Sequence, residues 1–305
     1  MTAAAPVSTI PPRRRLVIHA TGDFNVDPNY IPQFRTEGYE HALSGLDGMF
    51  VQDSITIVNL ECPISELGAA ADKTFTFRCD PAAIEAMRSG GIDVANLANN
   101  HSIDYGTDAM LDSITRLQEG QIAPVGVGAS ATEAARPAIL NINGWTVAVL
   151  GFGGVIPAAS WIATDERPGM ADGDTIETMV AAVEAADAIA DLVLVTIHWG
   201  VELDTQPRAD DVARAEAMVA AGADAIFGHH SHRLNPMEFV GGRPVAWGLG
   251  NFVWPRLSAA GSTTAIARVV VEESGAITAC LIPAEIVSGG HPELAGPVPA
   301  DCPDA

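Results

Sequence analysis

The chain has 305 residues, enough for one large α/β domain or two small ones with a sizeable core. Its 16 basic and 38 acidic residues give a formal net charge of −22, which excludes nucleic acid and anionic membrane surfaces as expected partners. The hydrophobic fraction is 48% and the aromatic fraction only 6%, so we expect a core of aliphatic side chains.

The two ends of the chain are predicted to lie outside the folded domain. Residues 1–14, rich in Ala and Pro, are predicted as a disordered lead, and residues 289–305 as a flexible tail. Residues 15–288 are predicted as one catalytic domain. The apolar run at 16–20 is too short for a signal-peptide core, and no stretch reaches the roughly 18 apolar residues of a membrane span. We therefore predict a cytoplasmic protein without a membrane anchor.

Apolar runs and turn signals predict an alternation of strands and helices in the first two thirds of the chain. The predicted strands are residues 16–20, 55–60, 94–98, 123–127, 138–142, 146–152, 192–197, 225–227, 245–249, 265–271 and 277–282. The predicted helices are residues 39–51, 81–89, 107–119, 175–190 and 209–221. Asn143-Gly144 predicts a tight hairpin turn. The alternation favours α/β layering, and the strand-rich last quarter favours a mixed sheet or a two-sheet sandwich.

The four cysteines show neither a CxxC pair nor the spacing of a zinc ribbon. They are Cys62, Cys79, Cys280 and Cys302. We predict that they are reduced thiols of a cytosolic protein, with Cys62 as a small buried side chain.

Five polar clusters each follow a predicted strand. They are Gly22-Asp23-Phe24-Asn25, Asn59-Leu60-Glu61, Asn99-Asn100-His101, His198-Trp199-Gly200 and Gly228-His229-His230-Ser231-His232. One cluster alone is weak evidence, because a Gly-Asp or Asn-Asn pair after a strand is commonly a turn. Side chains at the carboxyl ends of several strands converge in open α/β sheets. Carboxylate, amide and imidazole groups suit manganese, iron or zinc, so the five together predict one metal or acid–base site.

The order of these clusters resembles the CapA family of bacterial capsule proteins. Two stretches carry the resemblance further: Leu97-Ala98-Asn99-Asn100-His101-Ser102 with Asp104-Tyr105-Gly106, and Gly248-Leu249-Gly250-Asn251-Phe252. The resemblance implies the calcineurin-like metallophosphoesterase superfamily, with a two-sheet α/β sandwich flanked by helices and a dinuclear metal site.

The resemblance also implies roles for individual residues. It implies these metal ligands: Asp23, Glu61, Asn100, His198, His230 and His232. It implies that His101 is an outer-sphere general acid and that Glu61 replaces a bridging aspartate. His229 falls outside the matched spacing. Asn25 stands where the superfamily usually has a histidine, which leaves open whether two metals, one or none are bound.

Further residues are predicted to contact the substrate or to hold the metal ligands in position. These residues are Asn25, Asn59, Asn99, Arg78, Trp199 and Asn251. Arg78 is a candidate for binding an anionic group, although a surface ion pair is an equal alternative. Asn251 is expected to hydrogen-bond a ligand histidine.

Three functions remain open from the sequence. The first is metal-assisted hydrolysis of a phosphoester, in which two cations about 3.5–4 Å apart activate a water molecule. The second is metal-free epimerisation at a peptide Cα atom, as in CapA-like enzymes encoded with lasso peptides, with Asp23, His101 and His232 among the acid–base candidates. The third is a catalytically silent binding protein. The expected partner is a small molecule or a peptide, and the sequence gives no oligomeric state.

Overall fold

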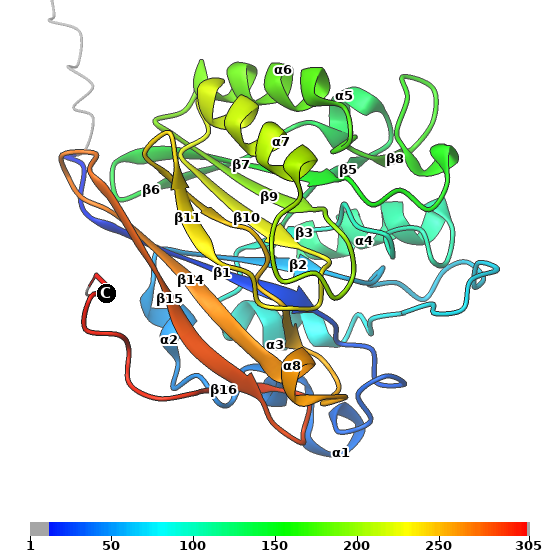
Figure 1. The fold of residues 1–305 in the computed structure, drawn as a ribbon. Coiled ribbons are helices and arrows are strands. Elements are labelled where there is room, and N and C mark those ends of the chain that lie inside the picture. Colours follow the sequence, from blue (N-terminus) through cyan, green and yellow to red (C-terminus); the bar gives the residue numbers. More distant parts are fainter. Residues whose placement is uncertain (1–11, 304–305) are drawn as a thin grey trace, which may run out of the picture.

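Two β-sheets lie face to face in the computed structural model, which describes residues 12–303 (Figure 1). The larger sheet has the order β16-β15-β14-β1-β2-β3-β4, and β13 also pairs with β1. Its strands are β1 (Leu16–Phe24), β2 (Ile55–Leu60), β3 (Val94–Asn96), β4 (Ala123–Val125), β13 (Asn251–Val253), β14 (Thr263–Val271), β15 (Ile277–Ile286) and β16 (Pro292–Leu294).

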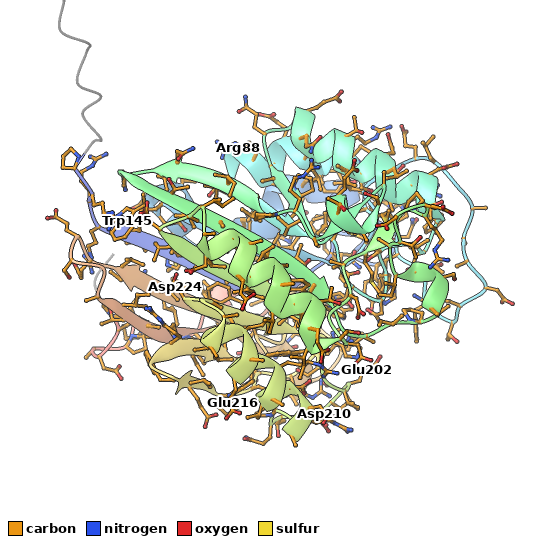
Figure 2. All side chains as sticks on the ribbon, turned by 90° about the horizontal axis from the view of Figure 1, so that it is seen from above. Arg88, Trp145, Glu202, Asp210, Glu216 and Asp224 are labelled. Carbon is orange, nitrogen blue, oxygen red and sulfur yellow. A yellow bond between two sulfur atoms is a disulfide. The ribbon has the colours of Figure 1, made fainter. Side chains whose placement is uncertain are left out.

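The second sheet has the order β11-β12-β10-β9-β7-β6. Its strands are β6 (Ala138–Ile142), β7 (Trp145–Gly153), β9 (Leu192–His198), β10 (Ala225–His229), β11 (Met237–Val240) and β12 (Arg243–Ala246). A separate short pair joins β5 (Val127–Gly128) and β8 (Gly169–Met170). Trp145, which begins β7, and Glu202, which follows the end of β9, mark opposite ends of this sheet (Figure 2).

Helices cover the outer faces of both sheets. They are α1 (Phe34–Glu37), α2 (Met49–Gln52), α3 (Ala83–Ser89), α4 (Thr107–Glu119), α5 (Ala131–Ala134), α6 (Ile176–Asp187), α7 (Ala209–Ala220) and α8 (Ala259–Ser262), with the 3-10 turns η1 (Tyr39–Leu43) and η2 (Ala159–Trp161). Helices α6 and α7 pack on the second sheet, while α1 to α4 pack on the first (Figure 1). The expected α/β sandwich of mixed sheets flanked by helices is therefore confirmed.

The inner core joins the two sheets through aliphatic side chains. Leu16 and Ile18 of β1 pack in one cluster with Val147 of β7 and Leu194 of β9, and all four are buried. All nine residues of β1 are buried because the strand is covered on both faces. The sequence predicted only residues 16–20 of this strand, because the polar residues Thr21 and Asp23 interrupt its apolar run.

The predicted helix at 39–51 is wrong. The structure instead has the short η1 and α2, separated by a turn. Gly48 lies at φ 72°, in the left-handed region that a continuous α-helix cannot contain. At Gly45, a Cβ atom would lie 2.4 Å from the carbonyl oxygen of Pro292, so the chain must pass closely there.

The C-terminal segment is packed, contrary to the prediction of a flexible tail. Strand β16 pairs antiparallel with β15, and Cys302 is bonded to Cys280. Residues 1–11 of the predicted lead, and residues 304–305 of the predicted tail, lie outside the described residues.

The prediction of reduced thiols is also wrong, because the four cysteines form two disulfides. Cys62 pairs with Cys79, and Cys280 with Cys302, with Cα–Cα distances of 5.6 and 5.1 Å that suit a disulfide. Partners 17 and 22 residues apart are brought together only by the tertiary fold, so spacing rules miss them.

The prediction of a cytoplasmic location loses the support that it drew from free thiols. Among residues 12–303, none of the helices has the length and apolar character needed to cross a membrane.

Candidate metal centre

The five polar clusters converge where strands of both sheets end. Asp23 lies near the end of β1, Glu61 follows β2, and His198 and His229 end β9 and β10. Strand register places Asp23 beside Asn59 and His198 beside His229. The carboxyl ends of neighbouring parallel strands share one edge, so the facing sheets bring all the clusters to one site.

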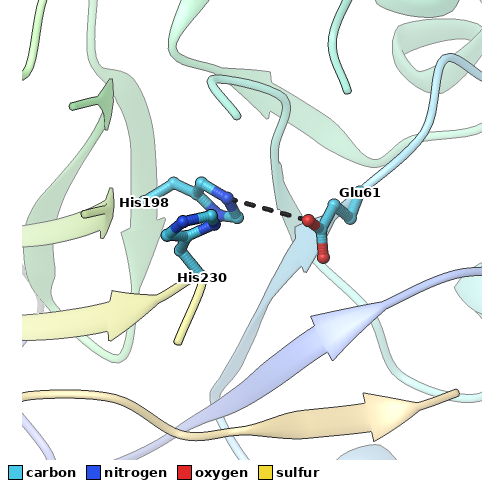
Figure 3. Close-up of side chains that lie close together, drawn as sticks. All are labelled: Glu61, His198 and His230. Atoms are coloured by element: carbon cyan, nitrogen blue, oxygen red, sulfur yellow. Dashed lines mark ion pairs between the residues drawn. The ribbon is translucent and has the colours of Figure 1, made fainter. Parts of the chain in front are cut away.

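One group of potential metal donors consists of Glu61, His198 and His230 (Figure 3). One donor atom of each lies within 4.8 Å of the others, and all three residues are buried. Nε2 of His198 is 3.7 Å from Oε1 of Glu61, and the two imidazole centroids are 4.8 Å apart. Asn100 belongs beside this group, because its Oδ1 lies 3.0 Å from Nε2 of His198.

A second group of donors consists of Asp23, Glu61 and His232. Nδ1 of His232 lies 3.0 Å from Oδ2 of Asp23 and 2.7 Å from Oδ1 of Asn251. Glu61 therefore belongs to both groups and lies between them.

The loop after β10 has an unusual backbone that directs two histidines to the site. His230 lies at φ 87° and His232 at φ 51°, in a region that non-glycine residues seldom adopt. The structure therefore keeps two strained residues in one short loop, which is typical of functional sites. His229 points to a different neighbour, with its Nε2 2.9 Å from Oγ1 of Thr196.

A network of amides positions the ligand side chains. Asn59 donates from Nδ2 to Oδ1 of Asp23 at 2.9 Å, and the same nitrogen lies 3.1 Å from Nδ1 of His198. Asn96 in turn donates to Oδ1 of Asn59, and Asn99 donates to the carbonyl oxygen of Leu60. This network contacts His198 at Nδ1, so its Nε2 is the ring nitrogen that faces Glu61.

Both carboxylate oxygens of Glu61 are buried without a hydrogen-bond partner, and so is Nδ1 of His230. A buried carboxylate without partners is costly, and such groups are found paired with charges or coordinating metals. Oxygen and imidazole donors without thiolates suit manganese, iron or zinc. The residues present therefore fit a site for divalent cations.

Burial and neighbouring charges shift the acidity of every donor. Burial, reinforced by Asp23, raises the pKa of Glu61 well above its usual range. Burial lowers the pKa of His198 well below its usual range and that of His230 to about 4. Burial opposes the charged form of His232 too, but Glu61 and Asp23 outweigh it and raise the pKa of His232 to about 10. Burial would raise the pKa of Asp23, yet contact with His232 leaves it lowered.

His101 stands next to both groups without belonging to either. Its Nε2 lies 4.0 Å from Oε1 of Glu61, while its Nδ1 lies 2.6 Å from Oδ2 of Asp104. Asp104 also pairs with Lys73 at 2.6 Å. Burial lowers the pKa of His101, and Asp104 opposes that shift. The contact with Asp104 thus orients the ring of His101 so that Nε2 faces the donor groups.

A cavity of about 260 Å³ opens beside His101 and His232. Sequence reasoning did not group the residues that line it, since they come from separate parts of the chain. They include Tyr30, Phe75, Phe77, Glu202, Leu203, Arg233, Trp254 and Leu257. Asp104 and Lys73 were likewise given no role, although Asp104 lies in the stretch that carries the family resemblance.

Three other predicted residues make contacts that differ from the expected ones. The guanidinium of Arg78 donates to the carbonyl oxygens of Leu67 and Gly68 and lies 3.6 Å from the ring centroid of Tyr105, so it is not directed at the donors. The buried indole of Trp199 donates to the carbonyl oxygen of Trp247 in the core of the second sheet.

Asn25 accepts the backbone N–H of Asp27 at 2.8 Å, and its Nδ2 has no hydrogen-bond partner.

The fold is shared with a solved enzyme. The crystal structure of 5'-nucleotidase from Candida albicans aligns with 90% of this chain and 53% of its own, at a TM-score of 0.52 and 12% identity. This similarity concerns the fold alone, which is a calcineurin-like two-sheet sandwich.

Sequence comparison identifies the family within this fold. Residues 17–256 match the family described as bacterial capsule synthesis protein PGA_cap, and the chain belongs to that family. Capsule biosynthesis protein CapA of Bacillus anthracis is 33% identical over 222 residues, covering 72% of this chain and 54% of that protein. PGA biosynthesis protein CapA of Bacillus subtilis is 35% identical over 185 residues, covering 60% and 48%. The chain thus spans about half the length of these curated relatives.

Proposed function

We propose that this protein is a metal-dependent hydrolase of phosphoesters. The observation that carries the proposal is Glu61, whose two buried oxygens lack hydrogen bonds and which belongs to both donor groups. The calcineurin-like fold supports the same chemistry. From the names of the CapA relatives, we propose further that the reaction serves capsule biosynthesis.

In this proposal the two donor groups hold one cation each, and Glu61 contributes to both. His198, His230 and Asn100 hold the first cation, and Asp23 and His232 hold the second. Bound divalent cations supply Lewis-acid polarisation of the phosphoryl group and lower the pKa of a water molecule. Asn59 keeps Asp23 and His198 in place through its two hydrogen bonds.

His101 completes the reaction as the general acid. The oxygen of water bonds to phosphorus and releases one proton to solvent, the ester P–O bond breaks, and the leaving alkoxide takes a proton from Nε2 of His101. The products are an alcohol and a phosphate. Asp104 orients the ring at Nδ1 and stabilises its protonated form, and Lys73 holds Asp104.

The direct test is hydrolysis of p-nitrophenyl phosphate and its diester by metal-stripped protein, with and without added manganese, iron or zinc. We expect activity that rises sharply with one of these metals and disappears in a chelator. Glu61→Gln should stay inactive with metal, while Glu216→Gln, which changes an exposed carboxylate of α7, should behave as wild type. Hydrolysis that is unchanged in the chelator would contradict the proposal.

The peptide epimerase alternative receives no support from the comparisons. It predicts exchange of one peptide Cα hydrogen with deuterated solvent in the absence of metal, which can be measured by mass spectrometry. We expect no such exchange.

A further inference from the structure

The cavity beside the two donor groups has an aromatic wall that continues into the site. Phe77 packs on Tyr30 at 4.6 Å between ring centroids and on Trp254 at 5.5 Å. The same wall contacts the site histidines, with Phe77 4.3 Å from His101 and Trp254 5.0 Å from His232. A group resting on this wall would therefore lie next to the reacting centre.

The mouth of the cavity exposes three large apolar side chains from three different loops. Phe75 is 64% exposed, Leu203 60% and Leu257 72%, and all three line the cavity. Each follows a different strand, so chain proximity does not explain why they meet. Exposed apolar side chains that gather around a hollow mark binding sites, whereas single scattered ones need no explanation.

The size and polarity of the cavity limit what it can hold. A cavity of roughly 150 Å³ accommodates benzene, so about 260 Å³ has room for one or two fused rings. Glu202 and Arg233 are the charged side chains at its edge besides the two histidines, and Arg233 donates to the carbonyl oxygen of His232 at 2.7 Å. The remaining wall is mainly apolar and aromatic.

We propose that this cavity is the leaving-group pocket, and that it selects phosphoesters whose alcohol carries a planar, largely apolar ring. The inference rests on the proposed hydrolase function. His101, the proposed proton donor to the leaving oxygen, lines the cavity, which places the leaving alcohol on this side of the donors. Contact of the ring with the aromatic wall of Phe77 and Trp254 then aligns the ester with Nε2 of His101.

The test compares 1-naphthyl phosphate with methyl phosphate in the metal-loaded protein. The double variant Phe75→Ser/Leu257→Ser alters only exposed side chains at the mouth. We expect the KM for 1-naphthyl phosphate to rise about tenfold with little change in kcat, while both constants for methyl phosphate stay the same. The control Ile189→Ser removes a side chain that is 63% exposed but lies beyond α6, and it should change neither substrate. An unchanged KM for the naphthyl ester, or an equal change for both esters, would overturn the proposal.

A binding measurement separates this proposal from the hydrolase proposal. Calorimetry with 1-naphthylphosphonate and methylphosphonate, which cannot be hydrolysed, should show at least tenfold tighter binding of the naphthyl compound by wild type. The double variant should lose most of that preference. If neither ester is hydrolysed but the preference is present, the hydrolase proposal fails and the pocket stands; equal binding of both phosphonates refutes the pocket.

Discussion

The two donor groups share Glu61 but differ in their surroundings. The group with His198 and His230 is closed, and the side chain of His198 is fully buried. The group with Asp23 reaches the cavity through His232, whose side chain is 17% exposed. The closed group has two imidazoles and the open group one.

This difference implies that the two proposed cation sites are not equivalent. Imidazole is a better ligand for these metals than an amide, and exclusion of water strengthens electrostatic contacts. We therefore expect the closed group to bind its cation tightly and the open group to bind weakly next to the substrate.

The largest effect is expected for Glu61→Gln. The amide keeps the shape of the side chain but removes the charge that both groups share. We expect metal content, measured by plasma mass spectrometry, to fall to a small fraction of an equivalent, and hydrolysis to fall to the background rate. Retention of one full equivalent would show that the closed group does not depend on Glu61 and that the sites are independent.

The next effect is expected for His101→Asn, which alters neither donor group. Loss of a general acid lowers kcat by about 10²–10⁴-fold. Metal content should stay at the wild-type value, because Nε2 of His101 is 4.0 Å from the nearest carboxylate oxygen of Glu61. A loss of metal in this variant would show that His101 belongs to one of the donor groups, and the ligand sets compared here would then be wrong.

The ranking of the sites is tested by His230→Ala against His232→Ala. Each variant should lose one equivalent of bound metal. The fall in metal affinity should exceed the about 10–100-fold caused by removing a residue that only hydrogen-bonds a ligand. His230→Ala should remove the tight equivalent and His232→Ala the weak one, as seen by calorimetric titration of the metal-stripped protein. If His232→Ala removes the tighter equivalent, the ranking is reversed.

Sequence reasoning located the strand ends of this site well. The ends of β2 and β9 were predicted to within one residue, because both strands are mostly apolar and polar residues follow them. Strand β1 was predicted to end at residue 20 but extends to Phe24, so Asp23 lies within the strand rather than after it. The short β11 and β13 were not predicted, since three or four residues carry little periodic signal. The predicted helix at 39–51 failed at Gly48, where the backbone turns into the left-handed region.

The site's supporting contacts could not be predicted in the same way. The contact between Asp104 and His101 is local, three residues apart, and was within reach of the sequence. The aromatic wall joins Tyr30, Phe77 and Trp254, which are far apart in the chain. Disulfide pairing has the same difficulty, because both depend on how loops are placed by the finished fold.

The smallest effect is expected for Asn251→Ala, which acts on the open group alone. Asn251 accepts from Nδ1 of His232 at 2.7 Å and donates to the carbonyl oxygen of Gly261 at 2.9 Å, so it fixes the ring without belonging to a donor group. Loss of such a partner costs about 10–100-fold in metal affinity. We expect that loss for the weak equivalent only, while the tight equivalent is unchanged, since His198 is held instead by Asn59 and Asn100. Asn141→Ala, at an exposed position of β6, is the matched control and should leave both affinities as in wild type. Equal weakening of both equivalents would mean that the groups are coupled through Glu61 so strongly that they act as one site.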